Sequence, residues 1–204
     1  MSVSDQINVA SMNPREQAML RLIRDTMGAQ IRAAIHGTPL TEAFVAALVA
    51  NESSGNPGAK RFEAAEAGWF IQVMSGSRPA YQGITKDKLQ AAILAGGLGW
   101  GSVAQTIEDL CTSWGPTQIM GWHGLKGGYK VGELQVLESH FKWAAFELMA
   151  FVNQFKLTLP GNSGWINLFH CWNAGAPHNP TSDPEYAMRG VMRMGLYEIL
   201  SKPQ

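Results

Sequence analysis

The sequence has no excess of charge of either sign, because 16 Lys and Arg residues balance 16 Asp and Glu residues. Nucleic-acid-binding domains usually present a strong positive field, so we expect no nucleic-acid partner. The chain also lacks any apolar run close to the ~20 residues that a membrane-spanning helix needs. We therefore expect no stable insertion into a membrane.

Cysteine is scarce, with Cys111 and Cys171 as its two positions. Two cysteines are too few for a disulfide scaffold. A disulfide between them and two buried free thiols both fit the sequence, and the frequent burial of cysteine favours the free thiols. The five histidines form neither a His-Glu-x-x-His motif nor part of a Cys-rich cluster. We therefore predict no metal and no cofactor.

Apolar residues recur at helical spacing along most of the chain. With 46% hydrophobic residues, the composition is typical of a packed globular protein. We predict one mainly α domain over residues 1–204, in which residues 1–37 form an N-terminal helix packed on the remainder. The predicted helices cover residues 14–37, 38–52, 85–95, 102–111, 134–155 (as one helix or two), 163–171 and 183–200. Residues 53–83 and 120–132, which are rich in Gly and Pro punctuation, are predicted to be an irregular or short-stranded arm and a loop.

Polar and small residues gather in three segments, each beside an apolar helical stretch. The segments are NESSGNP at 51–57, SWGPTQIMG at 113–121 and HCWNAGAP at 170–177. The end of a helix can present a functional group to a cleft while the body of the helix stays in the core. We therefore expect the functional side chains in these segments.

Glu52 is the leading candidate for an acid-base catalyst. It lies four residues after Leu48, at the end of an apolar helical run, so its carboxyl group is expected beside buried surface. Burial disfavours the charged form of a carboxyl group, and a glycosidase needs a protonated acid to protonate the departing sugar oxygen. The alternative is a glutamate that merely ends its helix, although an acid there is unfavourable against the helix dipole.

Gln118 and Asn173 are candidates for holding a ligand. Gln118 offers a single amide among apolar neighbours, which suits a sugar hydroxyl or acetamido group. Alternatively, it caps a Gly-Pro turn. Asn173 either holds a ligand or stabilises the turn before Pro177. The candidate stacking surfaces for sugars, some of which we expect to line a groove, are Trp69, Trp100, Trp114, Trp122 and Trp172.

Together and in this order, the three segments resemble those of the lysozyme-like superfamily, which includes goose-type lysozymes and soluble lytic transglycosylases. Glu52-Ser53 with Asn56-Pro57 matches the catalytic motif of that superfamily. Gly115 to Met120 matches its cleft-lining Gly-x-x-Gln-Ile-Met segment, and Trp172 to Gly175 matches its aromatic-Asn-Ala-Gly segment. The run SWGPTQIMG and the long separation between Glu52 and Gln118 are most similar to the N-acetylmuramidase family of phages and bacteria.

The resemblance implies a lysozyme-like helical fold with a small arm beside the active-site cleft. It also implies cleavage of the β-1,4 bond between N-acetylmuramic acid and N-acetylglucosamine in peptidoglycan, with Glu52 as general acid and base. The residues that it assigns to substrate binding are Ser53, Ser113, Gln118, Met120, Trp172, Asn173 and Tyr186. The family usually has tyrosine before the Asn-Ala-Gly run, where this chain has Trp172, so either Tyr186 supplies the missing hydroxyl or no residue does.

A second group decides the course of the reaction. A carboxylate about 6.5–9.5 Å from the acid activates water with inversion, and one at about 5–5.5 Å acts as a nucleophile. Glu63 is the first candidate, with Glu66 and Asp109 as alternatives, although any of the three is otherwise a solvated surface acid. Without such a group, the acetamido group of the substrate assists, and a lytic transglycosylase releases 1,6-anhydro-muramyl products.

Two other functions stay open: a catalytically silent wall-binding or phage structural module, and a chitinase-like hydrolase. The first 20 residues show no basic stretch followed by an apolar core, so we expect no secretory signal. We expect a monomer that is made in a host cytoplasm and whose partner is peptidoglycan. It would act on the wall after holin-type release or as part of a phage particle.

Overall fold

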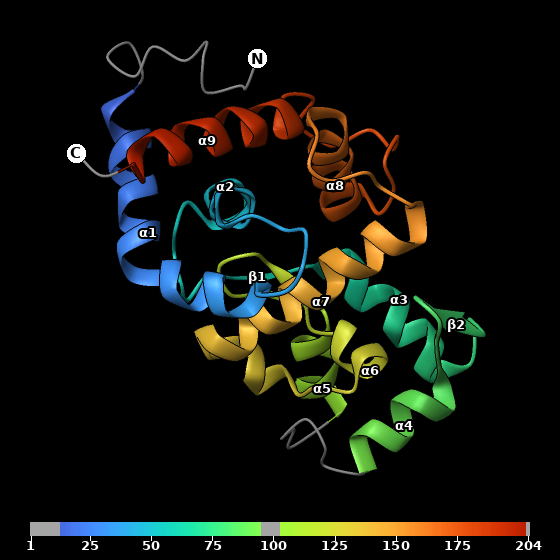
Figure 1. Cartoon of the computed structure of the whole chain (residues 1–204). Coiled ribbons are helices and arrows are strands. Elements are labelled where there is room, and N and C mark those ends of the chain that lie inside the picture. Colours follow the sequence, from blue (N-terminus) through green and yellow to red (C-terminus); the bar gives the residue numbers. More distant parts are fainter. Residues whose placement is uncertain (1–12, 95–102, 203–204) are drawn as a thin grey trace. The chain divides into compact units, whose positions relative to one another are not determined.

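The computed structural model describes residues 13–94 and 103–202, and its helices confirm the prediction of a mainly helical protein (Figure 1). Among the described residues, the helices are α1 (Pro14–Ile35), α2 (Glu42–Ser53), α3 (Ala64–Ser75), α4 (Lys86–Leu94), α5 (Val103–Leu110), α6 (His123–Gly127), α7 (Leu137–Phe155), α8 (Asn162–Ala174) and α9 (Tyr186–Leu200). A 3-10 helix, η3 (Val131–Gln135), precedes α7. The short strands are β1 (Lys60–Phe62), β2 (Ala80–Tyr81), β3 (Ile84–Thr85), β4 (Thr112–Trp114) and β5 (Ile119–Met120).

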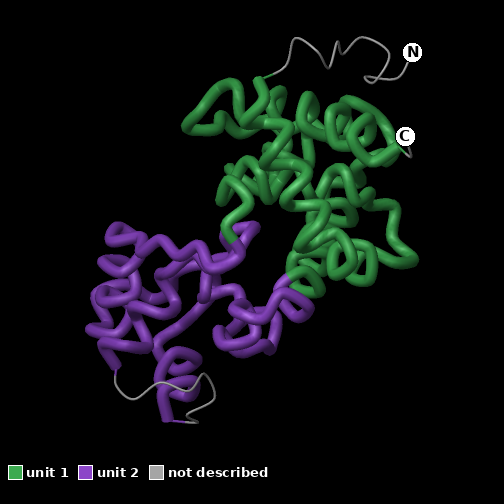
Figure 2. The backbone as a smooth tube through the Cα atoms, turned by 90° about the vertical axis from the view of Figure 1, so that its left-hand side faces the viewer, with its two compact units in different colours: residues 1–56, 141–204 green, residues 57–140 purple. Residues whose placement is uncertain are grey.

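The chain divides into two compact units (Figure 2). Unit 1 comprises residues 1–56 and 141–204, and unit 2 comprises residues 57–140. The division falls inside α7, between His140 and Phe141. The single domain over residues 1–204 stays a prediction. Within the described part of the chain, no helix is both long enough and apolar enough to cross a membrane.

Unit 1 is built around α2, whose residues from Ala43 to Ala50 are all buried. Helices α1 and α9 pack against it, and α8 packs against α9 (Figure 1). An apolar helix with no polar face is stable only when neighbours cover all its sides. The core of unit 1 therefore surrounds this helix and fixes where its last turn lies.

Helix α1 begins as predicted, because the side chain of Asn13 accepts a hydrogen bond from the backbone of Arg15 and Pro14 occupies the first turn. The start of α2 was predicted too early. The hydroxyl of Thr38 donates to the carbonyl of Ile35 at 2.7 Å and so closes α1. Thr41 is the residue that caps α2, because its hydroxyl accepts from the backbone N–H of Phe44 at 3.1 Å.

Unit 2 contains a three-stranded antiparallel sheet in the order β1-β4-β5 and a separate β2-β3 hairpin. In the central strand, Ser113 pairs with Arg61 of β1 on one side and with Met120 of β5 on the other. Helices α3 and α5 and the side chain of Trp122 share one buried apolar cluster beside these strands. The short strands of the predicted arm therefore lie in unit 2.

Helix α3 is absent from the predicted elements, because residues 53–83 were expected to be irregular. The segment contains Gly68, which costs about 1 kcal/mol in a helix relative to alanine. Ala67, Phe70 and Val73 nevertheless recur every three residues and are buried. Their burial outweighs the cost of one glycine, since each large apolar side chain contributes about 1.5–3 kcal/mol. The loop predicted over residues 120–132 was wrong in part, because this segment contains α6 and the start of η3.

Helix α4 lies within the helix predicted over residues 85–95, and α5 lies within the one predicted over 102–111. The predicted last residue of the first of these helices, Ala95, the predicted first residue of the second, Ser102, and the side chain of Trp100 lie outside the described residues. Helix α7 follows η3 as one continuous helix, which answers the alternative of one helix or two.

Cys111 and Cys171 are free thiols, and both are fully buried. Burial raises the pKa of the Cys111 thiol to about 12 and that of the Cys171 thiol to about 11. Because the thiolate is the reactive form, we expect neither cysteine to react with Ellman's reagent in the native protein near neutral pH. Both should react after unfolding in guanidinium chloride. Rapid labelling of either thiol before unfolding would contradict this burial.

Candidate functional site

Glu52 lies in the last turn of α2, two residues after Ala50, where the buried stretch of that helix ends, and its own side chain is half-buried. The helix ends because Ser54 and Gly55 both adopt left-handed backbone conformations, with φ of 52° and 83°. Glycine suits the second position, since a Cβ atom there would lie 3.1 Å from the Ile23 side chain of α1. The hydroxyl of Ser53 donates to the carbonyl of Val49 at 3.1 Å. The acid therefore lies at a helix end, as the sequence predicted.

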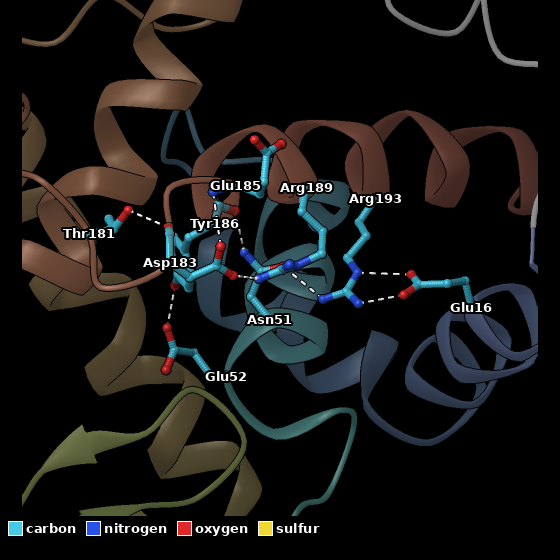
Figure 3. Close-up of polar contacts among 9 residues, drawn as sticks. All are labelled: Glu16, Asn51, Glu52, Thr181, Asp183, Glu185, Tyr186, Arg189 and Arg193. Carbon is cyan, nitrogen blue, oxygen red and sulfur yellow. Dashed lines mark hydrogen bonds and ion pairs between the residues drawn. The ribbon is translucent and has the colours of Figure 1, made fainter.

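The hydroxyl of Tyr186, from the first turn of α9, donates a hydrogen bond to Oε1 of Glu52 (Figure 3). The tyrosine ring is buried, with 5% exposure, and meets Phe169 of α8 edge to face. Burial, followed by the negative charge of Glu52 and the hydrogen bond to it, raises the pKa of the Tyr186 hydroxyl well above its ordinary value. Tyr186 therefore keeps its proton at physiological pH and acts as a donor to the carboxyl group. Trp172 has no hydroxyl at the position where the family usually has tyrosine. In this protein Tyr186 places a hydroxyl at Glu52.

A polar network beside Glu52 connects three helices of unit 1 (Figure 3). The guanidinium of Arg193 in α9 donates to Oδ1 of Asn51 at 2.8 Å and makes two bonds to Glu16 of α1, at 2.9 and 2.5 Å. The amide group of Asn51 donates in turn to the carbonyl of Tyr186 at 3.0 Å. The hydrogen bond from Arg193 is the main cause that lowers the pKa of Glu16. The residue next to the acid is therefore tied both to α9 and, through Arg193, to α1.

The start of α9 has its own polar contacts. Glu185 donates its backbone N–H to Oδ1 of Asp183 at 2.9 Å, and Arg189 forms an ion pair with the same carboxylate. Within this ion pair Arg189 donates a hydrogen bond to Asp183, and that bond is the main cause that lowers the pKa of Asp183. The helix was predicted to start at Asp183-Pro184 and begins at Tyr186. These contacts hold the start of α9, where Tyr186 is the first residue.

We predict that Arg193→Met destabilises the protein by about 2 kcal/mol, because hydrogen bonds to charged groups contribute about 1.5–3 kcal/mol and partners stay behind unsatisfied. The Arg193 side chain is 12% exposed, and that of Glu16 is 30% exposed. Urea unfolding measures the change. Arg21→Met is the matched control, since Arg21 is an exposed residue of α1. Equal stability of the two variants would show that the network contributes nothing.

In unit 2, three of the predicted site residues come together on the sheet. The hydroxyl of Ser113 lies 3.0 Å from the sulfur of Met120 and 3.5 Å from Oε1 of Glu63. Glu63 also forms an ion pair with Arg61 on β1. The other two candidates for a second carboxylate are bonded within unit 2 as well. Glu66 accepts from the hydroxyl of Tyr81 at 2.8 Å, and Asp109 accepts from the amide of Gln105 at 2.9 Å.

Gln118 closes the turn between β4 and β5. Its side-chain Nε2 donates to the carbonyl of Gly115 at 2.8 Å, and its backbone N–H donates to the same oxygen at 3.2 Å. Gly115 and Gln118 both have positive φ, 69° and 57°. The structure therefore has the glutamine-capped turn that was the alternative at this position. One N–H of the Gln118 amide donates to the carbonyl of Gly115 within the turn. The binding of a ligand by Gln118 stays a prediction.

Trp172 and Asn173 belong to the last turn of α8, where Trp172 is half-buried and Asn173 is exposed. The turn after the helix is closed by Asn179, whose amide donates to the carbonyl of Ala174 at 2.9 Å, and by Gly175, whose backbone N–H donates to the carbonyl of Cys171. The bonds that close this turn therefore come from Asn179 and Gly175.

The candidate stacking tryptophans differ in exposure. Trp69 is 41% exposed, although the guanidinium of Arg78 lies over its ring at 4.4 Å. Trp114 and Trp122 are buried, and the indole N–H of Trp114 donates to the carbonyl of Asp109 at 2.9 Å. Trp114 and Trp122 are therefore buried within unit 2, and Trp69 is more accessible for stacking with a sugar than either of them.

Sequence reasoning missed Asn51 and Arg193 in unit 1 and His140 in unit 2. Asn51 was visible as part of the first polar segment, but its partner is 142 residues away in sequence. His140 lies in an otherwise helical pattern, and no local signal distinguishes it from a surface histidine. Within residues 13–94 and 103–202, no group of three or more His, Cys, Asp or Glu side chains is arranged to hold a metal ion.

Comparison of this chain with protein-family models, with curated proteins and with solved structures finds no match. The function is therefore inferred from the residues and contacts of this chain.

Proposed function

We propose that the protein cleaves the glycan strands of peptidoglycan, with Glu52 as the acid that protonates the glycosidic oxygen. The observation that carries the proposal is the hydrogen bond from Tyr186 to Glu52 at the end of a buried helix. Catalysis needs a side chain held in one geometry beside the substrate. A carboxyl group at the end of a buried helix, held by the hydroxyl of a buried tyrosine, meets that requirement.

The contacts of Glu52 divide the work between two residues. Glu52 transfers the proton, which is general acid catalysis worth about 10²–10⁴-fold in rate. Tyr186 is a positioning residue, since its hydroxyl limits the rotation of the carboxyl group. The network of Asn51 and Arg193 supports both residues, because it binds the helix that carries Glu52 to the helix that carries Tyr186.

After the leaving group departs, two routes are open. A second carboxylate, for which the sequence predicts Glu63, activates water or attacks the sugar. Otherwise the acetamido group of the substrate assists, and Glu52 takes back a proton as the 1,6-anhydro ring closes. We propose hydrolysis as the main activity, with the lytic transglycosylase reaction as the alternative outcome.

The test is digestion of purified peptidoglycan by the protein, followed by mass spectrometry of the released fragments. Reducing N-acetylmuramic ends would support the hydrolase, and 1,6-anhydro-muramyl ends would select the transglycosylase. Chitin oligomers, digested in parallel, identify a chitinase-like hydrolase if they are the better substrate. Binding of peptidoglycan without any cleaved glycan would overturn the proposal in favour of a non-catalytic wall-binding module.

A further inference from the structure

A buried imidazole contacts the turn between β4 and β5. His140 lies in the first turns of α7, and its side chain has 0% exposure. Thr117, in the middle of the turn, is also 0% exposed. Both residues belong to unit 2, and neither has a part in the proton transfer proposed for Glu52.

The hydrogen bonds determine which ring nitrogen of His140 carries the proton. The backbone N–H of Thr117 lies 3.2 Å from Nε2, and the Thr117 hydroxyl lies 2.8 Å from the same atom. Because a backbone N–H can only donate, Nε2 must be an acceptor. Nδ1 therefore carries the hydrogen and donates to the carbonyl of Leu134 at 3.0 Å. The imidazole is neutral and connects the end of η3 to the turn.

The same ring also packs against the glycine at the start of the turn. A Cβ atom on Gly115 would lie 2.6 Å from the His140 ring and 3.0 Å from the carbonyl of Leu134. Gly115 also donates its backbone N–H to the carbonyl of Ala59 at 2.8 Å. The turn is therefore held at Gly115 by close packing and at Thr117 by hydrogen bonds.

These contacts fix Gln118, which follows Thr117 directly. Its φ of 57° lies in the left-handed region that non-glycine residues rarely adopt. A residue persists in such a conformation only when its surroundings hold it there. The hydrogen bonds from Gln118 to the carbonyl of Gly115 supply one restraint. The hydrogen bonds between Thr117 and Nε2 of His140 supply another.

We propose that His140 is a positioning residue, which holds the turn from Gly115 to Gln118 so that the Gln118 amide is ready to bind the glycan. This inference rests on the proposed function. A buried polar side chain is stable only while it is hydrogen-bonded. An apolar side chain would fill the same space, but it would leave the N–H of Thr117 without this acceptor and the conformation of the turn less restricted.

Two matched variants distinguish the contact of His140 with Thr117 from its contact with Leu134. In His140→Gln, the side-chain oxygen can still accept from Thr117. In His140→Asn, the shorter side chain keeps the contact with Leu134 and loses Thr117. On soluble glycan strands we expect His140→Asn to raise KM about fivefold with little change in kcat, since one hydrogen bond is worth about 1 kcal/mol. His140→Gln should keep a KM close to that of the wild type.

The decisive comparison repeats both variants in a Gln118→Ala background. If His140 acts through Gln118, His140→Asn raises KM no further there, because two changes in one chain of contacts are not additive. Circular dichroism and thermal unfolding verify that each variant is folded. Thr117→Val, which removes one hydroxyl with little change of shape, replaces His140→Asn if that variant does not fold, with the same expected direction.

The outcomes distinguish this inference from the proposed function. An active wild type together with a folded His140→Asn variant of unchanged KM would overturn the positioning role, and so would an additive effect in the Gln118→Ala background. If the wild type cleaves no glycan, the proposed function fails. Calorimetry then measures the affinity of the intact strands in the same variants. Affinity that depends on His140 only when Gln118 is present would support the inference, while affinity independent of His140, or no binding, would overturn it.

Discussion

Replacing Glu52 with glutamine is expected to lower the rate of peptidoglycan cleavage about 10³-fold, within the range that general acid catalysis contributes. Glutamine has nearly the same shape and still offers an oxygen to the Tyr186 hydroxyl, so the fold should be unchanged. Its amide has no acidic proton to give to a glycosidic oxygen. Release of soluble fragments from purified peptidoglycan measures the rate, and circular dichroism verifies the fold.

Two further variants make this test specific. Glu198→Gln removes an exposed carboxylate from α9 and should leave the rate unchanged. Tyr186→Phe removes the hydroxyl and retains the acid, so we expect a smaller loss, about tenfold, that appears mainly in kcat. A Glu52→Gln variant as active as the wild type would remove Glu52 from its catalytic role.

Acid should destabilise the protein through His140. Burial lowers the pKa of His140 from 6.5 to about 4, and the hydrogen bond to Leu134 only partly offsets this effect. The unfolded chain therefore binds a proton below pH 6.5, while the folded protein does not do so until about pH 4. The stability from this residue is thus complete above pH 6.5 and is lost as the pH falls towards 4. Integrated over this window, the loss is about 1 kcal/mol near pH 5.5 and about 3 kcal/mol near pH 4.

Urea unfolding at a series of pH values measures this loss. Carboxylates such as Glu16 also respond to acid, so the informative quantity is the difference between wild type and His140→Gln, which cannot take up the proton. We expect the wild type to lose about 3 kcal/mol more than this variant between neutral pH and pH 4. His178→Gln is the control for the removal of a histidine from the surface, because His178 is exposed. Parallel curves for wild type and His140→Gln would show that His140 does not bind protons differently in the two states.

Part of this protein follows from neighbouring residues alone. Asn13 and Pro14 start α1, and the Ser-Ser-Gly-Asn-Pro run ends α2 next to Glu52. Caps and turns act within a few residues of the chain, so the position of Glu52 at a helix end was predictable. Periodic apolar residues likewise predicted α1 and α7.

The tertiary structure decided the contacts that give these residues chemistry. Tyr186 donates to Glu52 from 134 residues away, and Arg193 reaches Asn51 from 142 residues away. It also decided that α3 is helical despite Gly68, and that the imidazole of His140 is buried with its proton on Nδ1. The physical reason is that local signals depend on backbone geometry over one or two turns. A hydrogen bond between distant segments depends on how whole helices pack.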